Sequence, residues 1–314
     1  MFRFVLGLLF SSGISLLAYR RRSLDRSGVG GAVITGTTTF GLGGWSWGLA
    51  LIFFFVSSSL LSHFREQDKA ETAADKFSKG SQRDIGQVAA NGGVATLLSL
   101  GYGLASSPAL RECLQAGYAG ALATANADTW ATELGVLSPR SPRLITTGKA
   151  VAPGTSGGIT ALGIGSSALG ALALGLVFWL LQGNRKAQIT LPLIALVSGL
   201  SGSLFDSLLG ATIQATYFCP VCGKETERRV HSCGTPTRMI RGLPWLNNDG
   251  VNFLATLFGA LLAMLLHRTT KLHQIMRTRH PVGATLVVAR SQERSNWLRS
   301  QSRQLLRSWR GRPP

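Results

Sequence analysis

Five acidic residues stand inside or at the ends of segments that are otherwise apolar: Asp84, Asp128, Glu133, Asp206 and Asp249. Ionisable side chains are costly inside a membrane and are functional candidates by default. A single acid at a helix end can also simply face water. All five fall at the same expected side of the membrane, and each is flanked by Asn, Gln, Ser, Thr or Gly. We therefore predict that they contribute to one site.

Helical spacing places several of these acids on polar faces, because residues three or four apart share a helix face. The polar stripes are Asp84-Gln87-Asn91, Ser203-Asp206-Gly210-Gln214, and Asn248-Asn252 with Asp249 beside them. Small residues let membrane helices approach closely, which explains Gly210 but not Asp206. Each stripe therefore predicts a polar helix face that packing alone does not require.

The segment 125–135 (ANADTWATELG) behaves differently if it is helical. Asn126, Thr129, Trp130 and Glu133 then share one face. Asp128 points about 140° away from Glu133 at about 100° per residue. The two acids can serve one centre only if the helix bends, and otherwise they have different partners.

Carboxylates with amide oxygens nearby suit a hard cation such as Mg²⁺, which typically binds through one or two carboxylates and substrate phosphates. The sequence holds no H-E-x-x-H, no G-x-S-x-G and no serine–histidine arrangement. Nothing in the placement of the five histidines suggests a histidine base. The pattern favours metal-assisted chemistry over nucleophilic catalysis.

The stretch 146–158 (TTGKAVAPGTSGG) is the best candidate for binding an anion. Its glycines, Gly157 among them, free backbone amides, Thr155 and Ser156 offer hydroxyls, and Lys149 supplies a charge. The stretch is expected to enter a helix, whose N-terminal amides favour phosphate. It is not a Walker A loop, because no G-K-[ST] occurs. A glycine-rich turn at a membrane face explains the composition equally well.

Three of the four cysteines cluster with a histidine as Cys219-x2-Cys222-x8-His231-x-Cys233. The spacing suits a structural zinc site, and four protein ligands leave no open position for catalysis. A disulfide is the alternative, but this connection is expected to be cytoplasmic, where thiols stay reduced. Cys113 stands alone in a helix and is expected in the core.

Composition places the chain in a membrane. It is 45% hydrophobic and 15% charged, whereas soluble domains carry about 25% charge. Apolar runs near the roughly 20 residues of a span predict an all-α, polytopic membrane helix bundle with seven or eight transmembrane helices. The expected helices are 2–18, 28–42, 45–63, 85–104, 109–126, 157–182, 188–215 and 250–267. The first lacks a cleavage site before Arg20 and reads as an anchor.

Basic residues alternate between the connections, with 4, 5, 3 and 5 in the odd ones against 0, 1 and 2 in the even ones. This positive-inside signal puts the odd connections in the cytoplasm and the N-terminus outside. We expect an integral domain over 1–267, with the zinc knuckle in a cytoplasmic connection 216–247. Residues 268–314 form a tail with 11 Lys/Arg and one acid. We assign the tail no role and expect no nucleic acid as a partner.

Five ordered motifs resemble a membrane family catalogued as domain of unknown function 92. They are RDIGQVAANG, ANADTWATELG, SPRLITTGKAVAPGTSGGIT, GLSGSLFDSLLGATIQA and LNNDGVNFL. The resemblance covers about residues 5–267 and leaves out the tail. The family includes transmembrane protein nineteen of animals and the plant phytyl-phosphate kinase, although most members have no established activity. The cysteine knuckle resembles only part of the family.

The resemblance implies phosphoryl transfer from a nucleoside triphosphate to an isoprenyl phosphate in the lipid bilayer, here the cell (inner) membrane. In such transfer the protein mainly positions groups and neutralises charge. We expect Mg²⁺ on Asp128, Asp206 and Asp249, with Glu133 as a further catalytic candidate. The phosphate would bind Arg83 and Lys149. The remaining candidates for orienting ligands are Asn91, Asn126, Thr155, Ser156, Gly157, Asn248 and Asn252.

Two other classes remain open from the sequence. A membrane transporter also carries intramembrane acids, ideally near mid-bilayer and in repeated halves. A non-catalytic membrane scaffold would need neither Lys149 nor the acids. The acids here sit toward one face and no internal repeat is evident, which argues against a transporter.

Overall fold

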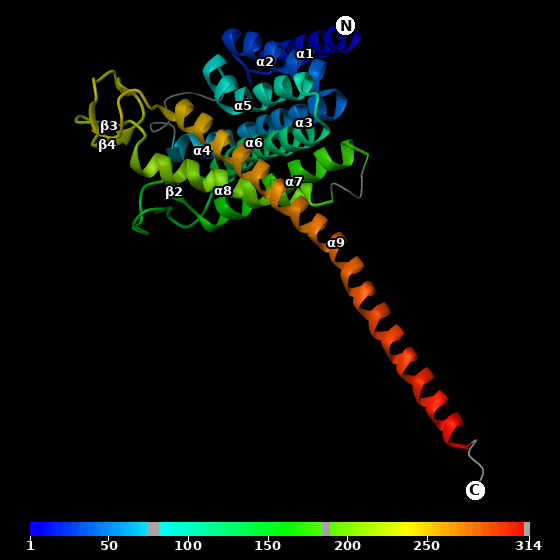
Figure 1. Cartoon of the computed structure of the whole chain (residues 1–314). Helices are drawn as coiled ribbons and strands as arrows, with labels where there is room; N and C mark the ends of the chain where they lie inside the picture. Colours follow the sequence, from blue (N-terminus) through cyan, green and yellow to red (C-terminus); the bar gives the residue numbers. More distant parts are fainter. Residues whose placement is uncertain (74–81, 184–188, 311–314) are drawn as a thin grey trace. The chain divides into compact units, whose positions relative to one another are not determined.

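The chain is mostly helical in the computed structural model, which describes residues 1–73, 82–183 and 189–310 (Figure 1). Four basic residues counted for the orientation, Lys76, Lys79, Arg185 and Lys186, lie outside this part of the chain. The helices are α1 (Phe2–Arg20), α2 (Arg26–Thr38), η1 (Thr39–Gly43), α3 (Trp45–His63), α4 (Glu66–Ala73), α5 (Ile85–Leu104), α6 (Pro108–Gly135), α7 (Ala161–Leu181), α8 (Leu191–Thr212) and α9 (Asn248–Arg310).

Five helices of the described chain are long and apolar enough to cross a membrane. They are α1, α3, α7, α8 and the part of α9 over Asn248–His273. The expectation of seven or eight spans also counted α2 with η1, α5 and α6, which do not meet both conditions. A membrane bundle is therefore supported, and the three additional spans remain a prediction.

Helix α6 is the central element of the bundle. It packs against α3, α5, α7 and α8, and every residue from Gln115 to Ala127 is buried. A helix that is buried on all sides needs no lipid-facing apolar stripe, which explains its modest hydrophobicity. The helix was expected to end near residue 126 but continues to Gly135.

Small residues set the distances between α6 and its neighbours. A methyl group added at Gly199 of α8 would lie 2.7 Å from the Cβ of Ala171 and 2.9 Å from the backbone of Ala123. One added at Gly202 would meet Thr124. Close backbone approach between small residues is a general way to pack helices in lipid, so α6, α7 and α8 form a tight core.

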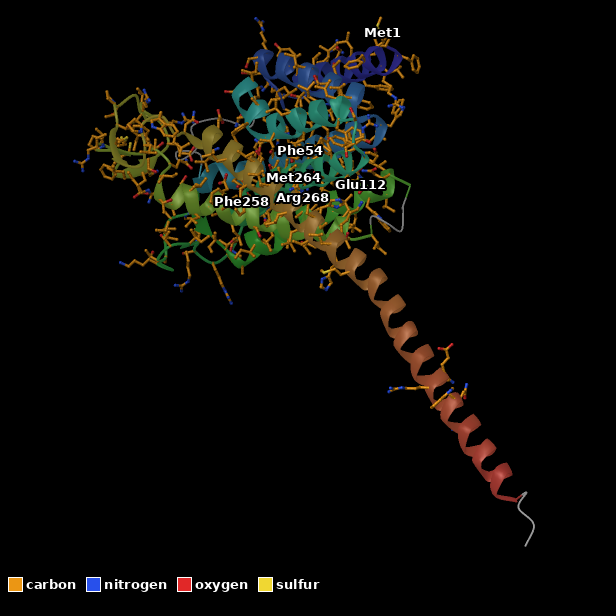
Figure 2. All side chains as sticks on the ribbon, viewed as in Figure 1. Met1, Phe54, Glu112, Phe258, Met264 and Arg268 are labelled. Atoms are coloured by element: carbon orange, nitrogen blue, oxygen red, sulfur yellow. The ribbon has the colours of Figure 1, made fainter. Side chains whose placement is uncertain are left out.

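Side chains fill the space between these helices. Figure 2 shows Phe54 and Met264 among them, on α3 and α9. Met264 lies against Gly117 of α6, where an added Cβ would be 2.9 Å from its Cγ. A buried aromatic cluster joins Trp47, Tyr118 and Phe178, with Tyr118 donating a 2.7 Å hydrogen bond to the carbonyl of Trp47.

The described residues include five short strands, all in connections between helices. β1 (Arg143–Leu144) pairs antiparallel with β2 (Gly158–Ile159). A second antiparallel sheet has the order β4-β3-β5, made of β3 (Thr216–Cys219), β4 (Lys224–Thr226) and β5 (Arg238–Arg241). Because residues 158–159 are in a strand, α7 begins at Ala161 with Thr160 as its cap, not at 157 as expected.

The chain divides into a compact unit over Met1–His267 and a second unit over Arg268–Pro314. The helices of the first unit pack in sequence across the bundle (Figure 1). The order is α1 with α2, then α5, then α6, then α7 with α8, and β3 and β4 lie at one end. The second unit is helical as far as Arg310.

Candidate functional site

Asp128 of α6 and Asp206 of α8 come together between the two helices. Ser203, one turn before Asp206, donates a 3.3 Å hydrogen bond to Oδ1 of Asp128. The carboxylates of Asp128 and Glu227 are both near enough to act electrostatically on Asp206. The structure thus groups three carboxylates, which we call the acid cluster: Asp128, Asp206 and Glu227.

One carboxylate oxygen of the acid cluster lacks a hydrogen-bond donor among the described residues. Oδ2 of Asp206 is buried and has no hydrogen-bond partner among the described residues. A buried acceptor without a donor costs roughly 1–3 kcal/mol, and more when it is charged. A cation bound beside Asp206 would remove this cost and also the repulsion among the three carboxylates. The donor set, all oxygen, fits a hard divalent cation such as Mg²⁺.

Glu227 connects the acid cluster to the glycine-rich loop. Its Oε1 accepts hydrogen bonds from Nε2 of Gln214 at 2.8 Å and from the hydroxyl of Ser156 at 3.1 Å. Gln214 follows the end of α8, and Ser156 lies in the loop between β1 and β2. One carboxylate therefore fixes the loop against the end of α8 beside Asp206.

The loop is held against α8 by Gly157. This residue has φ +81°, and a Cβ there would lie 2.5 Å from the Cβ of Ala211 and 2.6 Å from its amide nitrogen. Its carbonyl accepts from the amide of Ile145 at 3.0 Å. Lys149, at the far end of the loop, is exposed. Thr155 lies in a turn, where its amide bonds the carbonyl of Ala152 at 3.2 Å.

Glu133 has partners of its own, on another side of α6. Its two oxygens accept from the hydroxyl of Ser62 on α3 and from Nζ of Lys69 on α4, both at 2.6 Å. Since α6 stays helical through Gly135, Asp128 and Glu133 point in different directions. Glu133 therefore forms a partly buried ion pair, and the structure shows no contact of it with the acid cluster among the described residues.

The asparagines have structural partners. Asn126 is fully buried, accepts from the Ser57 hydroxyl at 3.0 Å and donates to the carbonyl of Gly170 at 2.8 Å. Asn91 donates to the carbonyl of Gln87 at 3.1 Å. Both amides thus tie helices or turns together.

Asp249 lies in the first turn of α9, next to Asn248 and one turn before Asn252. Between them, Val251 packs with Leu246 and with Leu209 near the end of α8. The start of α9 is therefore placed against the last turns of α8, the helix that carries Asp206.

Asp84 serves the fold. Its carboxylate accepts from the amide of Gln87 at 2.9 Å, and the Gln87 side chain accepts from the amide of Asp84 at 3.2 Å. This reciprocal capping box begins α5 and satisfies two free amides. The first two residues of the Asp84-Gln87-Asn91 stripe therefore form the N-terminal cap of α5.

Arg83 is held rigidly just before that cap. Its amide donates to the carbonyl of Ser23 and its carbonyl accepts from the amide of Asp25. The guanidinium lies over the ring of Phe55, 5.7 Å from the centroid. Burial lowers the pKa of Arg83, and the charge of Glu133 acts in the opposite direction.

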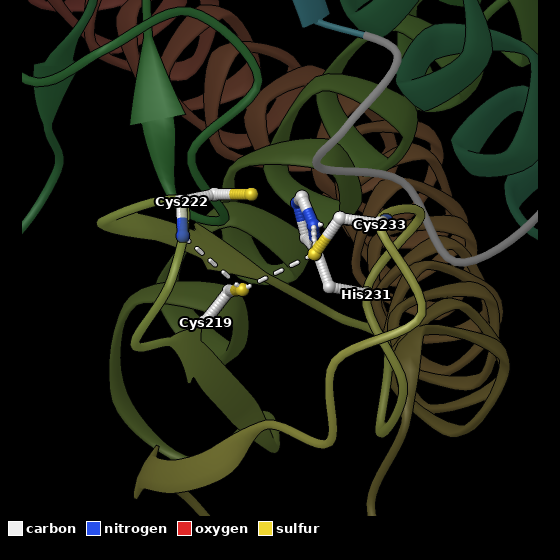
Figure 3. Close-up of side chains that lie close together, drawn as sticks. All are labelled: Cys219, Cys222, His231 and Cys233. Atoms are coloured by element: carbon white, nitrogen blue, oxygen red, sulfur yellow. Dashed lines mark hydrogen bonds between the residues drawn. The ribbon is translucent and has the colours of Figure 1, made fainter.

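Cys219, Cys222, His231 and Cys233 converge beside the three-stranded sheet (Figure 3). Their potential ligand atoms all lie within 4.8 Å of one another. Sγ of Cys219 and Sγ of Cys233 are 3.7 Å apart, and Nδ1 of His231 is 3.2 Å from Sγ of Cys233. Among the described residues, this is the group of three or more His, Cys, Asp or Glu compact enough to hold a metal ion as it stands.

The cluster has the chemistry of a metal site. Hydrogen bonding to Thr235 is the main cause that lowers the pKa of the Cys233 thiol to about 6, and a thiolate is the form that binds metal ions. All four cysteines are free. Three sulfur atoms and one imidazole nitrogen could therefore hold a metal ion, and four protein ligands are typical of structural sites.

Glu227 is the residue that sequence reasoning missed. It lies five residues beyond Cys222 in a polar connection, and no apolar segment or helical stripe marks it. The only signal available was that the stripe of α8 ends at Gln214, a side chain that needs a polar partner when buried. Its partner could not be identified without the fold.

Comparisons with known proteins agree with this architecture. The family model described as integral membrane protein DUF92 matches residues 9–260. Protein PGR of Arabidopsis thaliana is 36% identical over 288 residues, which cover 84% of this chain and 96% of that protein. An uncharacterized membrane protein of Methanocaldococcus jannaschii is 30% identical over 267 residues, 85% of this chain and 95% of the relative. The chloroplastic protein VTE6 of Arabidopsis thaliana is 27% identical over 266 residues, 83% and 69% of the two chains. No solved structure matches.

Proposed function

Since the chain belongs to the integral membrane protein family DUF92, we propose that it is a kinase that transfers a phosphoryl group from a nucleoside triphosphate to an isoprenyl monophosphate. The resemblance to the family that includes the plant phytyl-phosphate kinase supports this class of reaction. The site chemistry supports it independently, because phosphoryl transfer mainly needs positioned groups and neutralised charge.

The observation that carries the proposal is the buried, unpartnered Oδ2 of Asp206 beside Asp128 and Glu227. Two carboxylates from α6 and α8 and a third from the connection 216–247 repel one another unless a cation lies among them. Nothing about helix packing requires this arrangement. A Mg²⁺ ion held there would neutralise charge on the phosphates of a bound nucleotide.

The residues of the chain then have distinct roles. Asp128 and Asp206 hold the cation, and Asp249 in the first turn of α9 is proposed as a third ligand. Glu227 positions the glycine-rich loop through Ser156, a role that only the folded chain suggests. Lys149, exposed in the same loop, reaches phosphate oxygens, and the amides around Thr155 and Gly157 donate to them.

The proposed transfer forms one phosphorus–oxygen bond and breaks another. A phosphate oxygen of the isoprenyl monophosphate forms a bond to the γ-phosphorus, the bond between that phosphorus and its bridging oxygen breaks, and the nucleoside diphosphate leaves. The isoprenyl monophosphate becomes a diphosphate. The protein holds the two anions in line and lowers their repulsion.

The placement in the membrane is also proposed. The acid cluster faces the cytoplasm of the cell (inner) membrane and the N-terminus lies outside, because the odd connections are rich in Lys and Arg. Helices α2 with η1, α5 and α6 cross the bilayer inside the bundle, which gives seven or eight spans. The second unit, Arg268–Pro314, is a basic tail without an assigned role.

The cysteine cluster is proposed to bind structural zinc. Its donor set fits Zn²⁺, for which tetrahedral sulfur and nitrogen ligands are typical. Because Glu227 lies between Cys222 and His231 in the chain, ordering this connection would also order the residue that fixes the glycine-rich loop.

The function is tested with protein purified into nanodiscs and incubated with nucleotide labelled at the γ-phosphate. The acceptors are isoprenyl monophosphates of increasing chain length, with the free isoprenols as controls. Labelled isoprenyl diphosphate that forms only with Mg²⁺ supports a kinase. If wild-type protein forms none with any common nucleotide, the transporter or scaffold class replaces the proposal.

A further inference from the structure

An apolar cavity of about 740 Å³, its open mouth included, lies among α1, α2, α3 and α5. Its walls are mainly aliphatic and aromatic side chains such as Leu24, Leu51 and Phe54. None of the three acids of the acid cluster lines it.

The cavity has one cationic group, Arg83, in its lining. Nη1 of Arg83 is buried and has no hydrogen-bond partner among the described residues. Gln87 and Asn91 line the cavity next to it, four and eight residues further along, so the three side chains follow one face of α5 and its cap. The cavity is therefore mainly apolar, with three small hydroxyl side chains on α1 and α2 and one positively charged side at Arg83.

We propose that this cavity binds the hydrocarbon chain of the isoprenyl monophosphate, with the phosphate on Arg83. The inference rests on the proposed function and assigns a binding site to its substrate. A buried guanidinium with an unused donor favours an anion, and planar N–H groups match phosphate oxygens. The apolar walls favour a hydrocarbon chain over a soluble phosphate compound.

The test measures binding apart from turnover, with purified protein in nanodiscs of zwitterionic lipid and a tritiated isoprenyl monophosphate. Ala32, which lines the cavity, is replaced in Ala32→Phe to fill it. Ile34, two residues away on the same helix and 65% exposed, gives the matched control Ile34→Phe. Arg83→Gln removes the charge and Arg83→Lys keeps it, and the exposed Arg26 gives the control Arg26→Gln.

Affinity should rise with chain length in wild-type protein, and Ala32→Phe should abolish that rise. Arg83→Gln should weaken binding at least tenfold, Arg83→Lys should recover part of it, and both controls should bind as wild type. The isoprenol, inorganic phosphate and a two-chain anionic phospholipid should compete poorly. Equal binding by Ala32→Phe and Ile34→Phe, or competition by the phospholipid as strong as by the isoprenyl phosphate, would overturn the inference.

Asp206→Asn separates the two proposals, because Asp206 does not line the cavity. This variant should bind isoprenyl monophosphate as wild type. Binding in the cavity without any transfer by wild type would support this inference and contradict the kinase. Transfer that Ala32→Phe leaves unchanged at every chain length would support the kinase and contradict the cavity.

Discussion

The hydroxyl of Ser203 on α8 lies 3.3 Å from Oδ1 of Asp128 on α6. Ser203 precedes Asp206 by one helical turn. This contact fixes which face of α8 meets α6, since residues three apart share a face. It turns Asp206 toward Asp128 and leaves Oδ2 of Asp206 buried without a partner among the described residues. The proposed cation site follows from this one relationship between two helices.

Removing the Asp206 charge should lower turnover without lowering the stability of the fold. In Asp206→Asn, the repulsion with Asp128 and Glu227 is lost, so thermal unfolding in detergent should occur at or above the wild-type temperature. Mg²⁺-dependent turnover should fall about 10²–10³-fold, the usual effect of removing one group aimed at the transition state. The control Asp68→Asn changes an acid paired with Arg65, and it should leave turnover unchanged. A large drop in unfolding temperature for Asp206→Asn would speak against a cation site.

Gly157 and Gly148 form a matched pair in the glycine-rich loop. Both have positive φ, +81° and +67°, but a Cβ at Gly148 meets nothing within 4 Å, whereas one at Gly157 strikes Ala211. Gly148→Ala should cost about 1–2 kcal/mol of local backbone strain. Gly157→Ala should in addition push the loop from α8, break the Ser156–Glu227 bond and raise KM for nucleotide. Similar KM values for the two variants would show that the loop does not act through its contact with α8.

The cysteine cluster predicts one bound metal per chain. Elemental analysis of protein purified without chelator should find about one zinc per chain, and Cys219→Ser should lose it because a ligand is missing. Cys113, buried in α6 outside the cluster, gives the control Cys113→Ala, which should retain zinc. Proteolysis should then cut connection 216–247 faster in Cys219→Ser. Zinc-free wild-type protein would contradict the assignment.

Two helix glycines test the packing around α6. A Cβ at Gly202 would overlap Thr124, whereas a Cβ at Gly165 of α7 meets nothing within 4 Å. Gly202→Ala should destabilise the bundle by about 1–3 kcal/mol through overpacking. Gly165→Ala should be neutral or stabilise it by up to about 1 kcal/mol, because alanine is the better helix former. Thermal unfolding in one detergent compares them, and equal shifts would contradict the close approach.

The sequence was sufficient to predict helices and the residues of the cysteine cluster, because both depend on local spacing. Apolar runs located the long helices of the bundle, although α9 was expected to end near residue 267 and continues to Arg310. The C-x2-C and H-x-C motifs located four side chains that the fold does bring together. Helix geometry left two alternatives for Asp128 and Glu133, a bend in the helix or different partners, and the unbroken helix α6 corresponds to the second.

The sequence was insufficient where tertiary contacts decide. Helix α6 runs on beyond residue 126 because Ser57 and Gly170 satisfy Asn126 inside the bundle, and an apolar-run criterion stops at such a residue. Glu227 joins the acid cluster because of the way the connection 216–247 folds. No periodicity in the sequence predicts that fold. The partner of Glu133, Lys69, is 64 residues away in the chain.

The most direct test of the account is transfer of labelled γ-phosphate to an isoprenyl monophosphate by wild type, Asp128→Asn and Lys149→Ala, each checked for folding. Wild type should form the isoprenyl diphosphate with Mg²⁺. Asp128→Asn should form essentially none, and Lys149→Ala should turn over more slowly with unchanged unfolding temperature because its side chain is exposed. No diphosphate from wild type, or equal amounts from all three proteins, would contradict the proposed kinase.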